Sequence, residues 1–95
     1  MKGFHHIALK VRDFDRAFAF YTKGLGFELS MEWGRGDGRA AMLKAGEGCV
    51  LELFAGGSDA PTEGALIHFA LVSDNVDEDL AKAVAAGAEV TIPPT

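Results

Sequence analysis

The spacing of apolar and polar residues predicts a strand followed by a helix at the start of the chain. Residues 4–11 alternate between apolar and polar side chains, which is typical of a strand with one buried face. The apolar side chains of that face are Ile7, Leu9 and Val11. Residues 14–23 change to helical spacing, and Asp13 is a suitable N-cap before them. Their apolar stripe consists of Phe14, Ala17, Phe18 and Tyr21.

Three further strands are predicted over residues 25–33, 39–45 and 49–55, because each is apolar and bounded by turn residues. The glycine-rich tract 34–38 and the shorter tract 45–48 supply the turns. The first tract is not a phosphate-binding loop, since it lacks the Lys-Ser/Thr ending and precedes a strand. The first half of the chain is therefore predicted to form a strand, a helix and three further strands.

The second half repeats the opening of the first. The polar, flexible stretch 56–64 is predicted to be a linker, and residues 65–72 are predicted to form a strand. An acidic first turn begins a helix over about 76–86, and residues 88–92 begin another strand. The candidate N-caps of this helix are Asp74 and Asn75.

The chain also matches itself at a fixed offset. The tract that starts at His6 reads His-Ile-Ala-Leu, and the tract that starts at His68, 62 residues later, reads His-Phe-Ala-Leu. Asp15 and Asp77 keep the same offset. An internal repeat of this kind sets the architecture. It predicts a first βαβββ module over residues 1–55, the linker, and an incomplete second module over residues 65–95.

Three side chains are candidate metal ligands: His6, Glu52 and His68. Strand alternation places each of them on the face opposite the helices, unless a bulge reverses the register. Each histidine taken alone is more often a hydrogen-bonded structural residue. Glu52 lies between two leucines and needs a partner or solvent. The adjacent His5 is a weaker candidate, because its counterpart in the second tract is Ile67 and an exposed surface position would explain it.

Imidazole and carboxylate together favour a divalent transition metal, and the predicted cofactor is one ion of nickel, zinc, manganese, cobalt or iron. The ligands are far apart in sequence, so their spacing alone carries little information. The repeat strengthens the prediction, because it brings equivalent strands together and makes equivalent residues converge.

Composition excludes several function classes. The chain has 95 residues, a formal net charge of −5 and no cluster of basic residues, so nucleic acid is not a predicted partner. No apolar stretch approaches the roughly 20 residues of a membrane span, and the first residues do not resemble a secretion signal. Cys49 is the single cysteine, in an apolar run, and is expected to be a buried free thiol. These features predict a cytoplasmic protein.

The tract from His6 to Ala17, followed by Phe20-Tyr21 and Leu25-Gly26-Phe27, resembles the opening module of the vicinal oxygen chelate superfamily. This group includes lactoylglutathione lyase (glyoxalase), extradiol dioxygenases, epimerases and antibiotic-resistance proteins. The strands 50–54 and 67–71 resemble its later, ligand-bearing segments. The resemblance implies an α+β fold of paired βαβββ modules, with an open curved sheet around one metal. The second module here would stop after its βαβ part.

The resemblance also implies a ligand set and a reaction. His6, Glu52 and His68 would be three of the ligands, and Glu52 is the candidate catalytic carboxylate. A fourth ligand, a glutamate, would follow near position 114, beyond Thr95, by adding the offset of 62 to Glu52. The implied protein is a homodimer whose small substrate chelates the metal through adjacent oxygens. Proton transfer through an enediolate would then isomerise the substrate, as in glyoxalase.

Two other functions remain open on the sequence alone. A mononuclear iron dioxygenase would also use two histidines and one glutamate, and differs in its dependence on iron and oxygen. A metal-free module that sequesters an apolar drug is the third reading. The three candidate ligands argue against it, since a sequestering pocket needs none.

Overall fold

The computed structural model of the chain describes residues 1–58 and 68–94 and has the element order of one βαβββ unit followed by a helix. The strands are β1 (His6–Lys10), β2 (Glu28–Trp33), β3 (Ala40–Gly46) and β4 (Cys49–Phe54). The helices are α1 (Phe14–Ala19), the π-helical η1 (Phe20–Gly24), the short 3₁₀ helix η2 (Gly36–Gly38) and α2 (Val76–Ala85). The structure confirms the predicted α+β class and the first five predicted elements.

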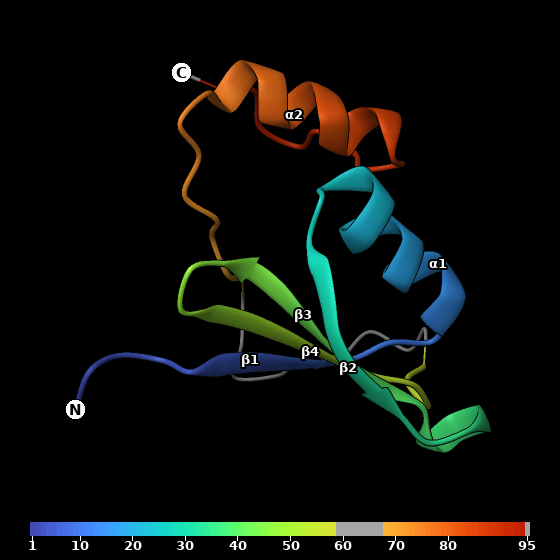
Figure 1. Cartoon of the computed structure of the whole chain (residues 1–95). Coiled ribbons are helices and arrows are strands. Elements are labelled where there is room, and N and C mark those ends of the chain that lie inside the picture. Colours follow the sequence, from blue (N-terminus) through green and yellow to red (C-terminus); the bar gives the residue numbers. More distant parts are fainter. Residues whose placement is uncertain (59–67, 95) are drawn as a thin grey trace.

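The four strands form one open sheet in the order β1-β4-β3-β2 (Figure 1). β1 runs parallel to β4, and the other two pairs are antiparallel. Helices α1 and α2 lie on the same side of this sheet, with α1 the nearer of the two. Among the residues that the structure describes, no helix covers the opposite face, and β1 and β2 form the two edges of the sheet.

The hydrophobic core lies between the sheet and α1, and is formed by alternate residues of β3 and β4. Its buried members are Phe14, Ala41, Leu43, Leu51, Leu53 and Ala55. The other residues of the predicted helix stripe pack against this core: Ala17, Phe18 and Tyr21. Leu9 and Val11 pack there too, so β1 turns the predicted apolar face toward the helix.

The helix after β1 begins as the sequence predicts, because the Asp13 side chain accepts a hydrogen bond of 3.1 Å from the backbone N–H of Arg16. It continues through the π-helical turn of η1 to Gly24. Gly26 takes the left-handed conformation, with φ 81°. Gly24 does not, and a Cβ atom there would lie 2.5 Å from the Cβ of Ala86.

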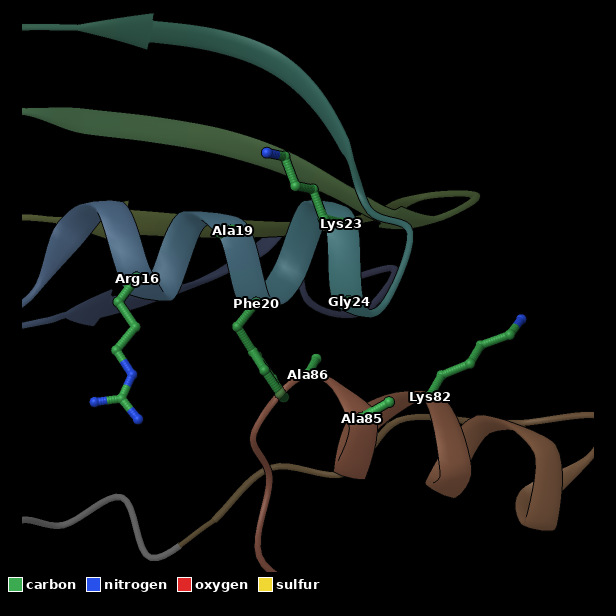
Figure 2. A pocket seen from close by; sticks show the side chains of 8 residues that line it. All are labelled: Arg16, Ala19, Phe20, Lys23, Gly24, Lys82, Ala85 and Ala86. Carbon is green, nitrogen blue, oxygen red and sulfur yellow. The ribbon is translucent and has the colours of Figure 1, made fainter.

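Helix α2 packs end-on against η1 through this close approach. In Figure 2, Ala86 lies just beyond the end of α2 and the Phe20 ring points toward it. Asn75 caps the helix, accepting a 3.1 Å hydrogen bond from the Glu78 backbone N–H, and Gly87 ends it with φ 113°. Asn75, and not Asp74, is therefore the N-cap. The helix has no buried residue, so its apolar stripe is only partly covered.

The two strands predicted for the second module do not form in the part of the chain that the structure describes. Residues 68–72 and 88–92 are irregular, and residues 65–67 of the first predicted strand lie outside the described residues. Apolar alternation predicted these strands, but a strand also needs a neighbour for its outward N–H and C=O groups. Within the described residues neither segment pairs with another strand.

Cys49 is exposed, contrary to the prediction that it is buried. It is the first residue of β4, directly after the turn at Gly48, so its side chain lies at the end of the sheet and outside the core. Over residues 1–58 and 68–94, none of the helices is both long and apolar enough to cross a membrane.

Candidate metal centre

His6 and Glu52 lie on the sheet face that the helices leave open. In the register of β1 and β4, His6 pairs with Val50 and Ala8 pairs with Glu52. The core residues Leu51 and Leu53 alternate with Val50 and Glu52, so the two candidate ligands point away from the core. This is the parity that strand alternation predicts, and no bulge interrupts it between β1 and β4.

The two side chains converge. Nε2 of His6 lies 3.9 Å from Oε1 of Glu52, while 40% of the His6 side chain and 12% of the Glu52 side chain are exposed. This distance is too long for an N–H···O hydrogen bond. Two metal–ligand bonds of about 2.1 Å at a tetrahedral angle would place the two ligand atoms about 3.4 Å apart, so side-chain rotations that close the gap by about 0.5 Å would let both atoms hold one cation. The imidazole nitrogen and the carboxylate oxygen therefore fit a divalent transition metal as part of its ligand set.

A second imidazole ring, that of His5, contacts the His6 ring. Nδ1 of His5 lies 2.8 Å from Nδ1 of His6, and the two rings meet edge to face with centroids 5.1 Å apart. His5 lies in a bend just before β1 begins, so it is not bound by the strand alternation that would send neighbouring side chains to opposite faces. His5 was the weaker candidate in the sequence because its counterpart in the second tract is Ile67, and the structure places its ring against that of His6.

Large apolar side chains share this face with Glu52. Met31 pairs with Met42, which in turn pairs with Glu52, and the Trp33 and Phe54 rings meet edge to face at 6.4 Å. Met31 is 58% exposed and Trp33 40% exposed. The carboxylate is therefore bordered by an apolar surface that is open to a ligand.

His68 is exposed and belongs to no strand. Among the residues that the structure describes, no group of three or more His, Cys, Asp or Glu side chains is placed to hold a metal ion. The structure thus brings together two of the three predicted ligands, and leaves His68 outside the pair.

Two hollows on the helix side include neither candidate ligand. One of about 520 Å³ lies between η1 and α2 (Figure 2). Its three cationic side chains, Arg16, Lys23 and Lys82, point in different directions and do not converge on a common point. The other, of about 1060 Å³, lies between the β3–β4 turn and residues 70–83. Neither hollow is lined by His6 or Glu52, so these two candidate ligands lie apart from both of them, on the open face of the sheet.

The comparisons with known proteins identify the family and the fold. The family model described as the glyoxalase/bleomycin resistance protein/dioxygenase superfamily matches residues 3–95. A 3-methylcatechol 2,3-dioxygenase of Pseudomonas putida is 48% identical over 44 residues, which make up 44% of this chain and 15% of that enzyme. The chain thus spans only a small part of the curated relative that it matches.

Solved structures resemble the whole chain. The antibiotic-binding protein TnmS3 of Streptomyces sp. CB03234 is 26% identical, with a TM-score of 0.74 over 100% of this chain and 78% of that one. A mutant of the fosfomycin resistance protein FosX of Listeria monocytogenes, complexed with Mn(II) and a dihydroxypropylphosphonic acid, shares the fold at 24% identity. Its TM-score is 0.71 over 100% of this chain and 73% of that one. The chain therefore belongs to the glyoxalase/bleomycin resistance protein/dioxygenase superfamily, also called the vicinal oxygen chelate superfamily.

Proposed function

We propose that the protein is a metal-dependent, glyoxalase-like lyase or isomerase whose small substrate binds through two adjacent oxygens. The observation that carries this proposal is the His6–Glu52 pair, 3.9 Å apart on an open apolar sheet face. A mostly buried carboxylate beside apolar side chains is costly unless it has a partner. A binding protein for apolar drugs has no need of that pair.

The proposed ligands are His6, Glu52 and His68. His68 would join the other two if residues 65–72 formed a strand beside the outer edge of β1, in the same chain or in a second copy. In support, β1 pairs on one side only, with β4, among the described strands. A free strand edge is a ready partner for another strand. We propose a homodimer on the same ground.

The residues of the open face would have three different roles in the reaction: metal binding, proton transfer and substrate binding. A bound divalent cation would act as a Lewis acid on the adjacent substrate oxygens. His6 and one carboxylate oxygen of Glu52 would hold that cation, and the second oxygen of Glu52 would move a proton between adjacent carbons. Met31, Trp33 and Phe54 would cover the apolar part of the substrate and exclude water from the carboxylate.

The test is activity of the protein loaded separately with Ni²⁺, Zn²⁺, Mn²⁺, Co²⁺ or Fe²⁺. The proposal expects isomerisation of a hemithioacetal that Glu52→Gln abolishes and Glu32→Gln leaves intact. Glu32 is a matched control, because it pairs with the core residue Ala41 and so lies on the other face of the same sheet. Turnover that survives Glu52→Gln would contradict the proposed role of the carboxylate.

A second candidate is an extradiol-type dioxygenase with one iron. The 48% identity over 44 residues with the catechol dioxygenase favours it. Oxygen consumption with a catechol and Fe²⁺, without isomerase activity, would select this candidate. Binding of an apolar antibiotic that a chelator does not affect, with no turnover, would instead select a sequestering protein like TnmS3.

We also propose a cytoplasmic location. The support is the single cysteine, whose thiol is free, since disulfides are rare in reducing compartments. Fractionation of cells that produce the protein would test the location, and recovery outside the cytoplasm would contradict it.

A further inference from the structure

Among the described residues of the open face, large side chains flank Glu52 on three sides and a small one lies on the fourth. In the register of the sheet, Glu52 lies between Ala8 on β1 and Met42 on β3. Val50 and Phe54 flank it along β4, because alternate residues of a strand share a face. These two side chains and Met42 are partly buried. Ala8 is exposed, and its side chain ends at the Cβ atom.

The neighbours of Ala8 on the same face of β1 leave the space beside the carboxylate open. His6 turns toward Glu52, with its Nε2 atom 3.9 Å from Oε1. Lys10 turns toward Gly56, where its Cε atom lies 3.8 Å from the position that a Cβ atom would take. Because Gly56 follows the end of β4, the Lys10 side chain extends away from Glu52. A gap therefore lies over Ala8, one strand spacing from the carboxylate.

We infer that Ala8 is a specificity-determining residue, whose small side chain leaves the space in which the oxygen-bearing carbons of the substrate lie against Glu52. The inference rests on the proposed function, which assigns proton transfer to one oxygen of that carboxylate. Such a transfer needs the reacting group within hydrogen-bond reach. Since the other three sides of Glu52 carry large side chains, the reacting carbons have to lie over Ala8. The site then favours substrates whose carbons beside the two oxygens carry small substituents.

Two substitutions on β1 test this placement. Ala8→Val adds two methyl groups to the gap, and valine is a residue that strands favour, so the sheet is expected to form. Lys10→Val is the matched control. It puts the same side chain on the same face of the same strand, but beside Phe54 and not beside Glu52.

Access to Glu52 is measured without metal or turnover, by coupling glycinamide to carboxylates with a water-soluble carbodiimide and analysing the peptides by mass spectrometry. Ala8→Val is expected to slow the coupling at Glu52 at least about 5-fold, the low end of what a steric overlap costs. Lys10→Val is expected to leave this rate unchanged. Glu32, on the other face of the sheet, is the internal reference in all three proteins. Equal coupling at Glu52 in the wild type and in Ala8→Val would overturn the inference.

The second measurement uses the Ni²⁺-loaded protein and the hemithioacetal of methylglyoxal as the probe. Ala8→Val is expected to lower kcat/KM about 10–200-fold, which is the usual effect of one methylene group that does not fit. The affinity for Ni²⁺ is expected to stay the same. A loss of Ni²⁺ affinity as large as the loss of kcat/KM would contradict a role in specificity, because Ala8 would then act through the metal-binding pair.

The two measurements separate this inference from the proposed function. Slower coupling at Glu52 in Ala8→Val, with no isomerase activity in any of the proteins, would support control of access by Ala8 and refute the proposed reaction. Turnover by Ala8→Val that equals that of the wild type would overturn the role of Ala8 and leave the reaction standing.

Discussion

The junction of η1 and α2 depends on the absence of a side chain at Gly24. A Cβ atom there would lie 2.5 Å from the Cβ of Ala86, whereas ordinary contact begins near 3.4 Å. Gly24→Ala would therefore force the two elements apart by about 0.9 Å. The backbone at Gly24 is not in the left-handed region, so alanine itself is compatible with the local conformation.

Two effects of opposite sign decide the stability of Gly24→Ala. Replacing glycine reduces the freedom of the unfolded chain, which stabilises the fold by about 0.4–1 kcal/mol. Overpacking costs about 1–3 kcal/mol. Because the clash with Ala86 outweighs the entropy gain, the Gly24→Ala variant is expected to lose about 1–2 kcal/mol in free energy of unfolding. For a chain of this size its Tm falls by roughly 5–15 °C.

Thermal and urea unfolding followed by circular dichroism measure this difference. Gly38→Ala is the matched control, because its backbone is likewise outside the left-handed region and nothing lies within 4 Å of the added atom. Ala86→Gly in the Gly24→Ala background removes the clashing methyl group and should recover stability. A Gly24→Ala variant as stable as the wild type, or more stable, would refute the packing of α2 against η1.

Three further predictions concern the first module. Arg39→Ala should lower the free energy of unfolding by about 1 kcal/mol in urea titrations, more than Asp15→Asn. Arg39 pairs with Asp15 at 2.8 Å and also covers the Phe14 ring at 4.3 Å, so equal losses would contradict a role for the ring contact. Leu53→Ala should cost about 2–5 kcal/mol, since Leu53 is fully buried, and a loss below 1 kcal/mol would contradict its place in the core. Burial raises the pKa of Tyr21 above 10.0, so the neutral form is favoured in the folded state. Stability should be complete below pH 10 and fall as the pH rises above it, and a Tyr21→Phe variant that falls equally steeply would exclude this cause.

The sequence predicted the first module well because each element there has strong local signals and a partner nearby in the chain. Alternation in β1 and β4 correctly placed His6 and Glu52 on one face. Their closeness then follows from the parallel pairing of β1 with β4, which local patterns alone do not specify. The internal repeat predicted a different convergence, of the equivalent residues His6 and His68, and within the described residues His68 belongs to no strand.

The second half was predicted less well, because strands depend on tertiary partners. Helix α2 formed as predicted from its own cap and acidic first turn. Residues 68–72 and 88–92 have apolar alternation but no neighbouring strand in the described chain. The expected third ligand, His68, depended on the first of these strands. Contacts such as that of Gly24 with Ala86 join segments that are distant in the sequence, and no local sequence pattern predicts them.

The most direct test of the central claim is the affinity of the protein for one divalent cation, measured by competition between Ni²⁺ and a chelating indicator. The claim predicts a site that binds about one equivalent and that weakens at least about 100-fold in His6→Ala and in Glu52→Gln, beyond the usual effect of outer-shell partners. The Glu32→Gln variant, which loses a carboxylate from the opposite face, should bind as the wild type does. Equal affinity in all four proteins would contradict the assignment of His6 and Glu52 as the metal-binding pair.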